Sequence, residues 1–234
     1  MAKGSQQPIF QSPPVVLATI AVLAAIHAVL QYAGQSWQVW SLYALAFIPA
    51  RFGSEPFSMI PGSQAWSFFT YALLHGSWMH LLFNSLWLLI FGTVVARYLG
   101  ALKFLLLSAI AAAGGALVTL LLHWGQQYVM VGASGSVSGL MAAAVPIMYG
   151  RNAMWAGWSA GDPLTTRPLS PAQLLSNRNA IIFTVVWLAI TLYSGASGFT
   201  GNSYMADGEI AWEAHIGGFV SGLVAFYLLQ RVRA

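Results

Sequence analysis

Residues 101–122 read ALKFLLLSAIAAAGGALVTLLL, an apolar run in which Lys103 is the single charged side chain. About 20 apolar residues in a helix cross the hydrocarbon core of a bilayer, so this run predicts a transmembrane helix. The whole chain agrees with it: 58% of its 234 residues are hydrophobic and only 6% are charged. Water-soluble proteins carry roughly 25% charged residues. The composition therefore indicates one integral membrane domain.

Five further apolar segments flank this run and bring the predicted number of spans to six. In chain order they are Val15–Tyr32, Trp78–Val95, Ala133–Tyr149, Ala180–Tyr193 and Ala211–Leu229. We therefore predict an all-α, six-transmembrane-helix bundle that occupies residues 15–230. Residues 1–14 are expected to form a cytoplasmic N-terminal tail, and residues 231–234 a cytoplasmic C-terminal tail. The fourth and fifth segments are short for a hydrocarbon core of about 30 Å, so either they begin or end below the membrane surface or the bilayer thins around them.

The basic residues follow this six-span arrangement. If the N-terminus is cytoplasmic, Arg51 is the only one of the nine basic residues that falls outside. The inner segments then hold Lys3, Arg97, Lys103, Arg151, Arg167, Arg178, Arg231 and Arg233. Such a bias is the positive-inside pattern of membrane proteins, and it predicts that both termini lie in the cytoplasm. This bias also accounts for the net charge of +4 and the pI of 9.6. The expected partner is therefore the lipid bilayer and not a nucleic acid.

Two connecting segments differ in character. The outer loop at residues 33–77 is rich in aromatic residues, and tryptophan and tyrosine favour the headgroup region. We expect this first loop, often numbered L1, to be membrane-embedded and to hold short interfacial helices packed on the bundle. The inner loop at residues 150–179 contains Pro163, Pro168 and Pro171 and shows no periodicity, which predicts a linker with no visible chemistry.

Ser134 lies in the segment Gly132-Ala133-Ser134-Gly135 at the start of the fourth span. Glycines around a serine at a helix start allow a tight turn and open access to the hydroxyl. The first turn of a helix also has free backbone N–H groups, which suit a developing oxyanion. Small residues are equally common where membrane helices pack closely, so this motif alone leaves packing and catalysis both open.

His215 favours the catalytic interpretation. On a helix, His215, Gly218 and Gly222 share one face, and the two glycines form a GxxxG pattern that lets helices approach closely. The fourth span has a matching face of small residues at Gly135 and Gly139. Packing these faces together would bring the histidine near the serine at the outer end of the contact. A nucleophile and its general base require this proximity.

Three further polar residues bear on the site. His80 and Asn84 lie four residues apart on one face of the second span and would donate hydrogen bonds to an oxyanion, or would link helices. His75 lies just before that span and would support them. Glu213 is two residues before the histidine and so faces away from it. The pattern therefore predicts a Ser134–His215 dyad without a carboxylate.

A zinc site is the rival chemistry. His75, His80 and His215 would supply three ligands. However, the chain has no cysteine, no His-Glu-x-x-His motif and no carboxylate beside these histidines. We therefore expect neither a metal nor another cofactor.

Together these motifs resemble those of the rhomboid intramembrane serine proteases. The matching segments are His75–Asn84 (HGSWMHLLFN), Gly132–Gly135 (GASG) and Ala214–Gly222 (AHIGGFVSG), on the second, fourth and sixth spans. The resemblance implies that Ser134 is the nucleophile and that His215 is the base. It further implies that His80, Asn84 and the Ser134 N–H form the oxyanion hole, with His75 in a supporting role.

The resemblance also implies a substrate class and a location. The expected substrates are single-span or multi-span membrane proteins, cut in or near a transmembrane helix, with no metal and no ATP. The compact form is similar to bacterial inner-membrane members of the family, with the active site opening to the outer face. We expect the top of the fifth span and the loop at Ser194–Gly208 to act as a gate.

Two positions depart from the family pattern. The family usually has an aromatic residue four places after the serine, stacked on the histidine ring, and here that residue is Ser138. Another group must then orient His215, for which the Ser138 hydroxyl is a candidate. The family often has a glutamate where Ala96 stands, after the second span.

Two other functional classes fit the sequence less well than a protease. A non-proteolytic rhomboid-like protein that binds client helices would typically lack the serine or the histidine, and both are present. A channel or transporter would be expected to show intramembrane charges and broken helices in paired repeats, and neither is visible.

Overall fold

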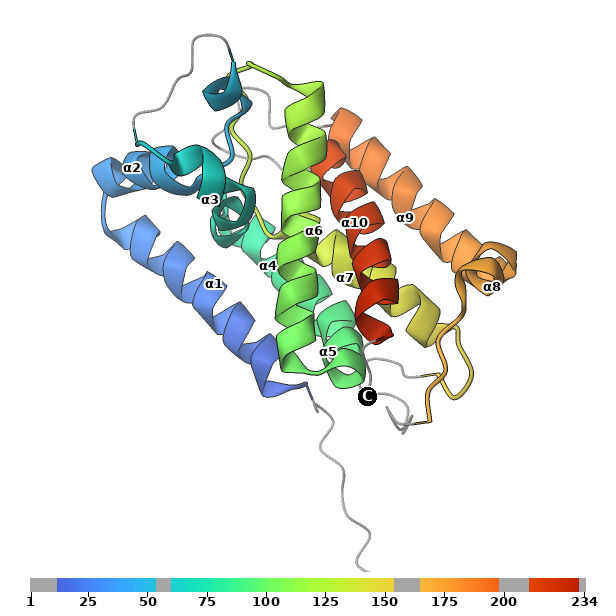
Figure 1. Ribbon diagram of the computed structural model, residues 1–234. Helices are drawn as coiled ribbons and strands as arrows, with labels where there is room; N and C mark the ends of the chain where they lie inside the picture. Colours follow the sequence, from blue (N-terminus) through green and yellow to red (C-terminus); the bar gives the residue numbers. More distant parts are fainter. Residues whose placement is uncertain (1–11, 54–59, 154–164, 198–210, 232–234) are drawn as a thin grey trace, which may run out of the picture.

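The computed structural model describes residues 12–53, 60–153, 165–197 and 211–231, and within these ranges all regular elements are helical (Figure 1). Six long helical segments form the bundle. They are α1 (Pro14–Tyr32), the continuous run of α4 (Trp78–Trp87), η3 (Leu88–Gly92) and α5 (Thr93–Leu99), then α6 (Ala101–Leu122), α7 (Ser134–Met148), α9 (Arg178–Ser197) and α10 (Trp212–Gln230). The all-α, six-helix prediction is confirmed, with the second span extended to Leu99.

Length divides these six segments into two groups. Among the described residues, α1, α4–α5, α6 and α10 are each long and apolar enough to cross a membrane. Helices α7 and α9 are the two shorter apolar ones, as their sequences predict. A π-helical segment, η3, interrupts the second span one turn after Asn84, and such segments are frequent at functional sites.

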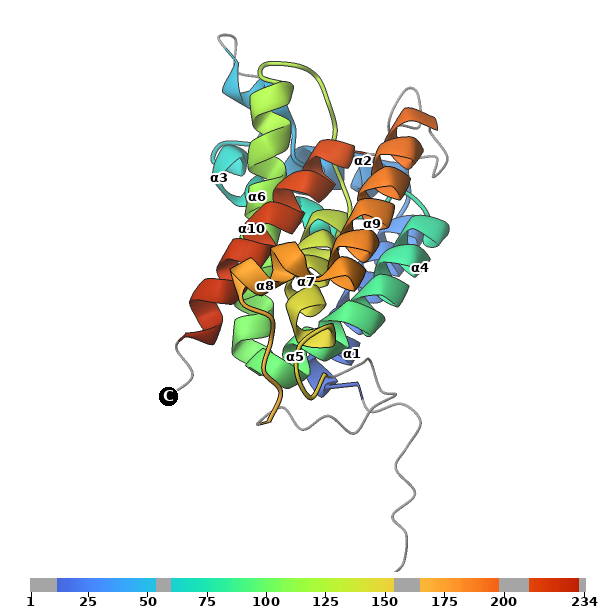
Figure 2. The ribbon, with the colours of Figure 1, turned by 90° about the vertical axis from the view of Figure 1, so that its right-hand side faces the viewer.

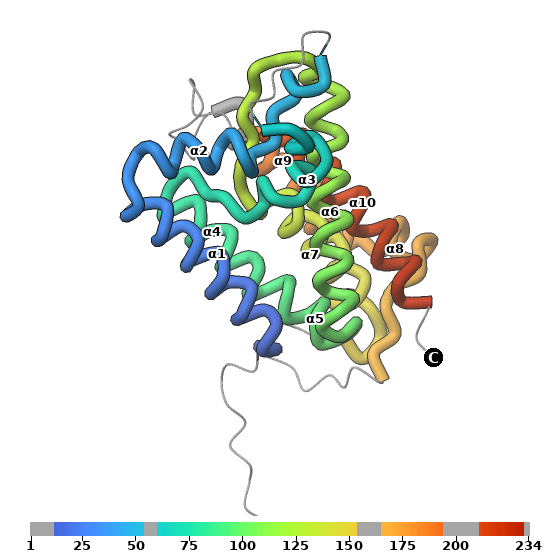
Figure 3. The backbone as a smooth tube through the Cα atoms, turned by 60° about the vertical axis from the view of Figure 1, so that its left-hand side comes forward, coloured from blue at the N-terminus to red at the C-terminus, as the bar shows by residue number. Residues whose placement is uncertain are grey.

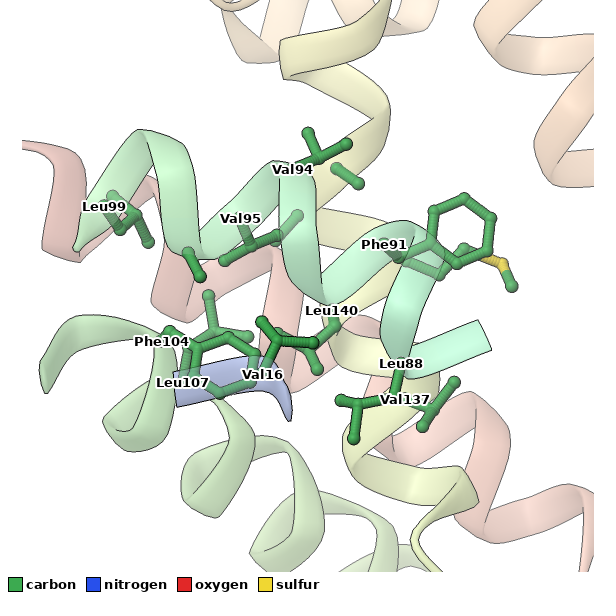
Figure 4. Packing of buried hydrophobic residues seen from close by; sticks show 14 of the residues in the cluster. Val16, Leu88, Phe91, Val94, Val95, Leu99, Phe104, Leu107, Val137 and Leu140 are labelled. Atoms are coloured by element: carbon green, nitrogen blue, oxygen red, sulfur yellow. The ribbon is translucent and has the colours of Figure 1, made fainter. Parts of the chain in front are cut away.

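Helix α7 forms the centre of the bundle. All its residues from Gly135 to Met148 are buried, against α6 and α10 on one side and α5 and η3 on the other (Figure 2). Helices α1 and α9 lie at the periphery and leave large apolar side chains exposed, as lipid-facing helices do. Val94, Leu107 and Leu140 belong to the largest buried cluster, which joins α5, α6 and α7 (Figure 4).

The outer loop forms short helices, as predicted from its aromatic residues. They are α2 (Gln35–Leu45), η1 (Pro49–Phe52), α3 (Ser63–Thr70) and η2 (Tyr71–Leu73). Figure 3 shows α2 and α3 at one end of the bundle, beyond the end of α1. Phe47 and Met130 exchange two backbone hydrogen bonds of 3.1 and 2.9 Å, which tie this loop to the segment before α7.

Arg51, the one basic residue placed outside by the charge pattern, is used within this loop. Its side chain is only 3% exposed, and its guanidinium donates to the carbonyl oxygens of Ala46, at 2.8 Å, and Tyr43. These carbonyls belong to the C-terminal end of α2, where cations are favoured. Arg51 therefore caps a helix.

The inner loop, predicted to be a linker, contains one short helix among its described residues. Residues 171–176 form α8 (Pro171–Ser176). Pro171 occupies its first turn, and Ser170 and Gln173 form a reciprocal capping box. Arg151 and Arg167 also exchange backbone hydrogen bonds across the loop. The sequence shows no apolar period here because local capping stabilises so short a helix.

Candidate active site

Ser134 is the first residue of α7, and the chain reaches it from the outer end of α6. Helix α6 has 22 residues and α7 has 15, which at 1.5 Å per residue makes α7 shorter by roughly 10 Å. The segment between them runs back along the bundle before α7 starts (Figure 1). The serine therefore lies below the end of the bundle at which α6 ends, which is why the fourth span looks short in the sequence.

The turn before Ser134 is fixed by the outer loop. Gly132 has φ 119°, a conformation that favours glycine, and its N–H donates to the carbonyl oxygen of Tyr71 at 3.0 Å. A Cβ atom on Gly132 would lie 2.6 Å from Cε1 of His80. The His80 ring thus packs directly on the backbone of this turn, and the first N–H groups of α7 have no partner within the helix.

Helices α7 and α10 approach each other through the two faces of small residues. A Cβ atom on Gly218 would lie 2.1 Å from the carbonyl oxygen of Gly135. One on Gly222 would lie 2.3 Å from Cα of Gly139. The backbones therefore touch, and His215 lies one turn before the first of these contacts.

Ser134 and His215 line one cavity of about 720 Å³ between η3, α7, α9 and α10. Asn84 and Ser138 also line it, and its remaining wall is mostly apolar, including Trp87 and Trp187. In the described part of the chain no hydrogen bond joins the Ser134 hydroxyl to the His215 ring. Catalytic hydrogen bonds are often long without substrate. The structure thus brings the predicted nucleophile, base and one oxyanion donor to the same space.

The two side chains predicted as oxyanion donors, His80 and Asn84, both lie on α4. The Asn84 amide donates to the carbonyl oxygen of His80 at 3.1 Å, and Asn84 is buried. Ser77 caps the helix by accepting the N–H of His80 at 3.1 Å.

His75 lies in the outer loop behind these donors and is buried. Its ring centroid is 5.2 Å from that of His80 and 6.5 Å from that of His27 on α1. Burial, reinforced by the two neighbouring imidazoles, lowers the pKa of His75 to about 3, so the ring is neutral at physiological pH. Among described residues, no three potential ligands converge to hold a metal.

The two departures from the family pattern lie close to the site or to its supports. Ser138 is buried and lines the cavity with His215, but within the described ranges no hydrogen bond joins the two residues. Its role in orienting the ring remains a prediction. Ala96 is buried in the apolar cluster of α5. Glu213 bonds His123 and not His215, in keeping with a dyad.

Tyr71 supports the site, and the sequence reasoning did not single it out. The side chain is 1% exposed, and its hydroxyl donates to the carbonyl oxygen of Ala112 on α6 at 3.0 Å. A Cβ atom on Gly135 would lie 2.6 Å from this hydroxyl, and one on Gly115 would lie 3.1 Å from it. The ring therefore fills the space that two glycines leave beside the Ser134 turn. The two glycines were the available signal in the sequence, because residues without side chains leave a space that an aromatic side chain can fill.

We expect Tyr71→Ala to destabilise the protein by about 3–5 kcal/mol, because it empties a packed aromatic site. Tyr71→Phe should cost about 1 kcal/mol through the lost hydrogen bond. Thermal unfolding in detergent measures both changes. Phe69→Ala is the matched control, since that ring lies on α3 and is 49% exposed. If Tyr71→Ala unfolded no earlier than Phe69→Ala, this packing role would be wrong.

The fold and the site define a helical membrane protein with a serine and a histidine that line the same pocket. A model of the Rhomboid domain matches residues 62–232, which is well over half of the chain, and the chain therefore belongs to the rhomboid family.

Curated proteins named Rhomboid protease GlpG are similar over most of the chain. That of Yersinia pestis (strain Pestoides F) is 25% identical over 218 residues, and that of Salmonella paratyphi A is 27% identical over 214. That of Pectobacterium atrosepticum is 28% identical over 212 residues. These matches cover 90–92% of this chain but only 61–62% of those proteins, so the chain spans less than two thirds of their length.

Proposed function

We propose that this protein is an intramembrane serine endopeptidase that hydrolyses peptide bonds in or near transmembrane segments of membrane proteins. One observation carries the proposal: Ser134 and His215 line the same cavity, below the outer end of the bundle. The names of the similar proteins support the same reaction class.

The chemistry follows from the positions of the groups. His215 accepts the Ser134 hydroxyl proton as the serine oxygen attacks the scissile carbonyl carbon. The oxyanion is stabilised by the Ser134 N–H and by the side chains of His80 and Asn84. His215 then protonates the leaving amine, which departs and leaves an acyl-enzyme. Water deprotonated by His215 attacks that ester, and Ser134 regains its proton.

The cavity wall suits a substrate in membrane surroundings. Trp87, Phe183 and Trp187 present apolar surface beside the polar dyad, so an unwound stretch of a helix would keep its apolar side chains covered. Small residues in that stretch would best allow the backbone to reach Ser134. We propose single-span or multi-span membrane proteins as substrates, with the site open to the outer face of a bacterial inner membrane and both termini cytoplasmic. Residues 198–208 of the predicted gate lie outside the described residues.

The test is cleavage of a fluorescent single-span substrate by the purified protein in lipid vesicles. A fluorophosphonate probe is applied in parallel, with mass spectrometry of the labelled peptide. We expect a cleaved product and a label on Ser134. If several substrates stayed intact and Ser134 stayed unlabelled, the protease would be the wrong conclusion and a client-binding role would take its place.

A further inference from the structure

An ion pair joins the outer ends of α6 and α10, away from the dyad. His123 follows the last residue of α6, and Glu213 lies in the first turn of α10, two residues before His215. Nε2 of His123 is 2.6 Å from Oε1 of Glu213. The glutamate is only 5% exposed. A buried carboxylate without a partner is costly, so this contact matters more than an exposed ion pair would.

The surroundings of His123 favour its charged form. Its Nδ1 faces Oε1 of Gln126 at 3.1 Å, while its other ring nitrogen faces the Glu213 carboxylate. A neutral imidazole donates through one nitrogen only, whereas an imidazolium donates through both. The ring is also stacked on Tyr128, with centroids 4.4 Å apart and planes 3° apart, an arrangement that favours a cation.

Each of the two helix ends favours the charge that its own residue of the pair carries. The C-terminal end of α6 favours a cation at His123, and the N-terminal end of α10 favours an anion at Glu213. From the described part of the chain, the titratable groups that face His123 are Glu213 of α10 and Tyr128 of the loop after α6. The second oxygen of Glu213 has no hydrogen-bond partner among the described residues, so His123 is its main compensation.

The pair lies where it controls the placement of His215. Immediately after Glu213, Ala214 packs on α6, since a Cβ atom on Gly115 would lie 2.7 Å from its carbonyl oxygen. Three residues after His215, Gly218 meets the backbone of Gly135. His215 thus lies between an electrostatic anchor to α6 and a backbone contact with α7. Loss of the anchor frees the first turn of α10 to rotate or fray.

We propose that Glu213 and His123 are positioning residues: their ion pair holds the first turn of α10 against α6 and so keeps His215 in place beside α7. This inference rests on the proposed function.

The experiment measures kcat and KM for the fluorescent substrate in vesicles at one fixed pH. The proteins are wild type, Glu213→Gln, His123→Lys and the control Gln127→Ala, an exposed residue of the same loop. We expect Glu213→Gln to lower kcat roughly three- to tenfold, with KM little changed, because the first turn of α10 loses its anchor. His123→Lys keeps a cation opposite Glu213 and should stay near wild type, as should the control.

A second arm follows thermal unfolding in the Ser134→Ala background, where Glu213→Gln should unfold earlier than its parent and His123→Lys should not. A kcat of Glu213→Gln equal to that of wild type would overturn this inference and leave the protease intact. Absence of cleavage by every protein would overturn the proposed function instead, and the unfolding arm alone would then decide whether the pair holds α10.

Discussion

Ser134→Ala is expected to lower kcat for a transmembrane substrate by at least about 10⁴-fold, because it removes the hydroxyl that we propose attacks the carbonyl from the cavity. His215→Ala should cost about as much. The double variant should be hardly worse than either single one, since nucleophile and base act as a unit. Substrate binding should persist, because the apolar wall of the cavity is unchanged.

Gel-based cleavage in vesicles, with product quantified over long incubations, measures this loss. Ser136→Ala is the matched control, because Ser136 lies on the same helix but donates its hydroxyl to the carbonyl oxygen of Ser108 at 2.8 Å. That variant should keep activity within a few-fold of wild type. Equal activity of Ser134→Ala and Ser136→Ala would remove Ser134 from the reaction.

Most of the bundle could be predicted from the sequence because each span is one local apolar run. The runs 15–32 and 101–122 match α1 and α6 almost residue for residue. The small faces of the fourth and sixth spans were also visible, since the spacing of Gly218 and Gly222 is a property of one helix. What these faces contact depends on how the helices pack. From the spacing alone, contact between the two faces was the favoured prediction.

The side-chain contacts that escaped prediction are tertiary. Tyr71 was one aromatic residue among many in the outer loop, and nothing near it in the sequence indicates that it would lie beside Gly135. Glu213 was correctly expected to face away from His215, but its partner, His123, is 90 residues away along the chain. The direction of Glu213 followed from helical spacing, whereas its partner followed from how α6 and α10 pack.

The second large effect is expected from Gly218→Val. Its Cβ atom would lie 2.1 Å from the carbonyl oxygen of Gly135, where no side chain can rotate away because the contact is with backbone. The helices must separate, at a cost of about 1–3 kcal/mol or more. A shift of about 1 Å between reacting groups costs about 10²-fold in rate, so we expect cleavage to fall by at least that factor.

Two readouts separate loss of geometry from loss of folding, namely the rate of fluorophosphonate labelling of Ser134 and the midpoint of thermal unfolding. Val220→Leu and Val224→Leu are the controls, because both side chains lie on the exposed face of the same helix, 57% and 55% exposed. They should leave both readouts near wild type. Gly222→Val should resemble Gly218→Val in stability but perturb labelling less, since its contact with Gly139 lies one turn further from the dyad. If Gly218→Val labelled Ser134 at the wild-type rate, the close contact between α7 and α10 would not be what aligns the serine with its base.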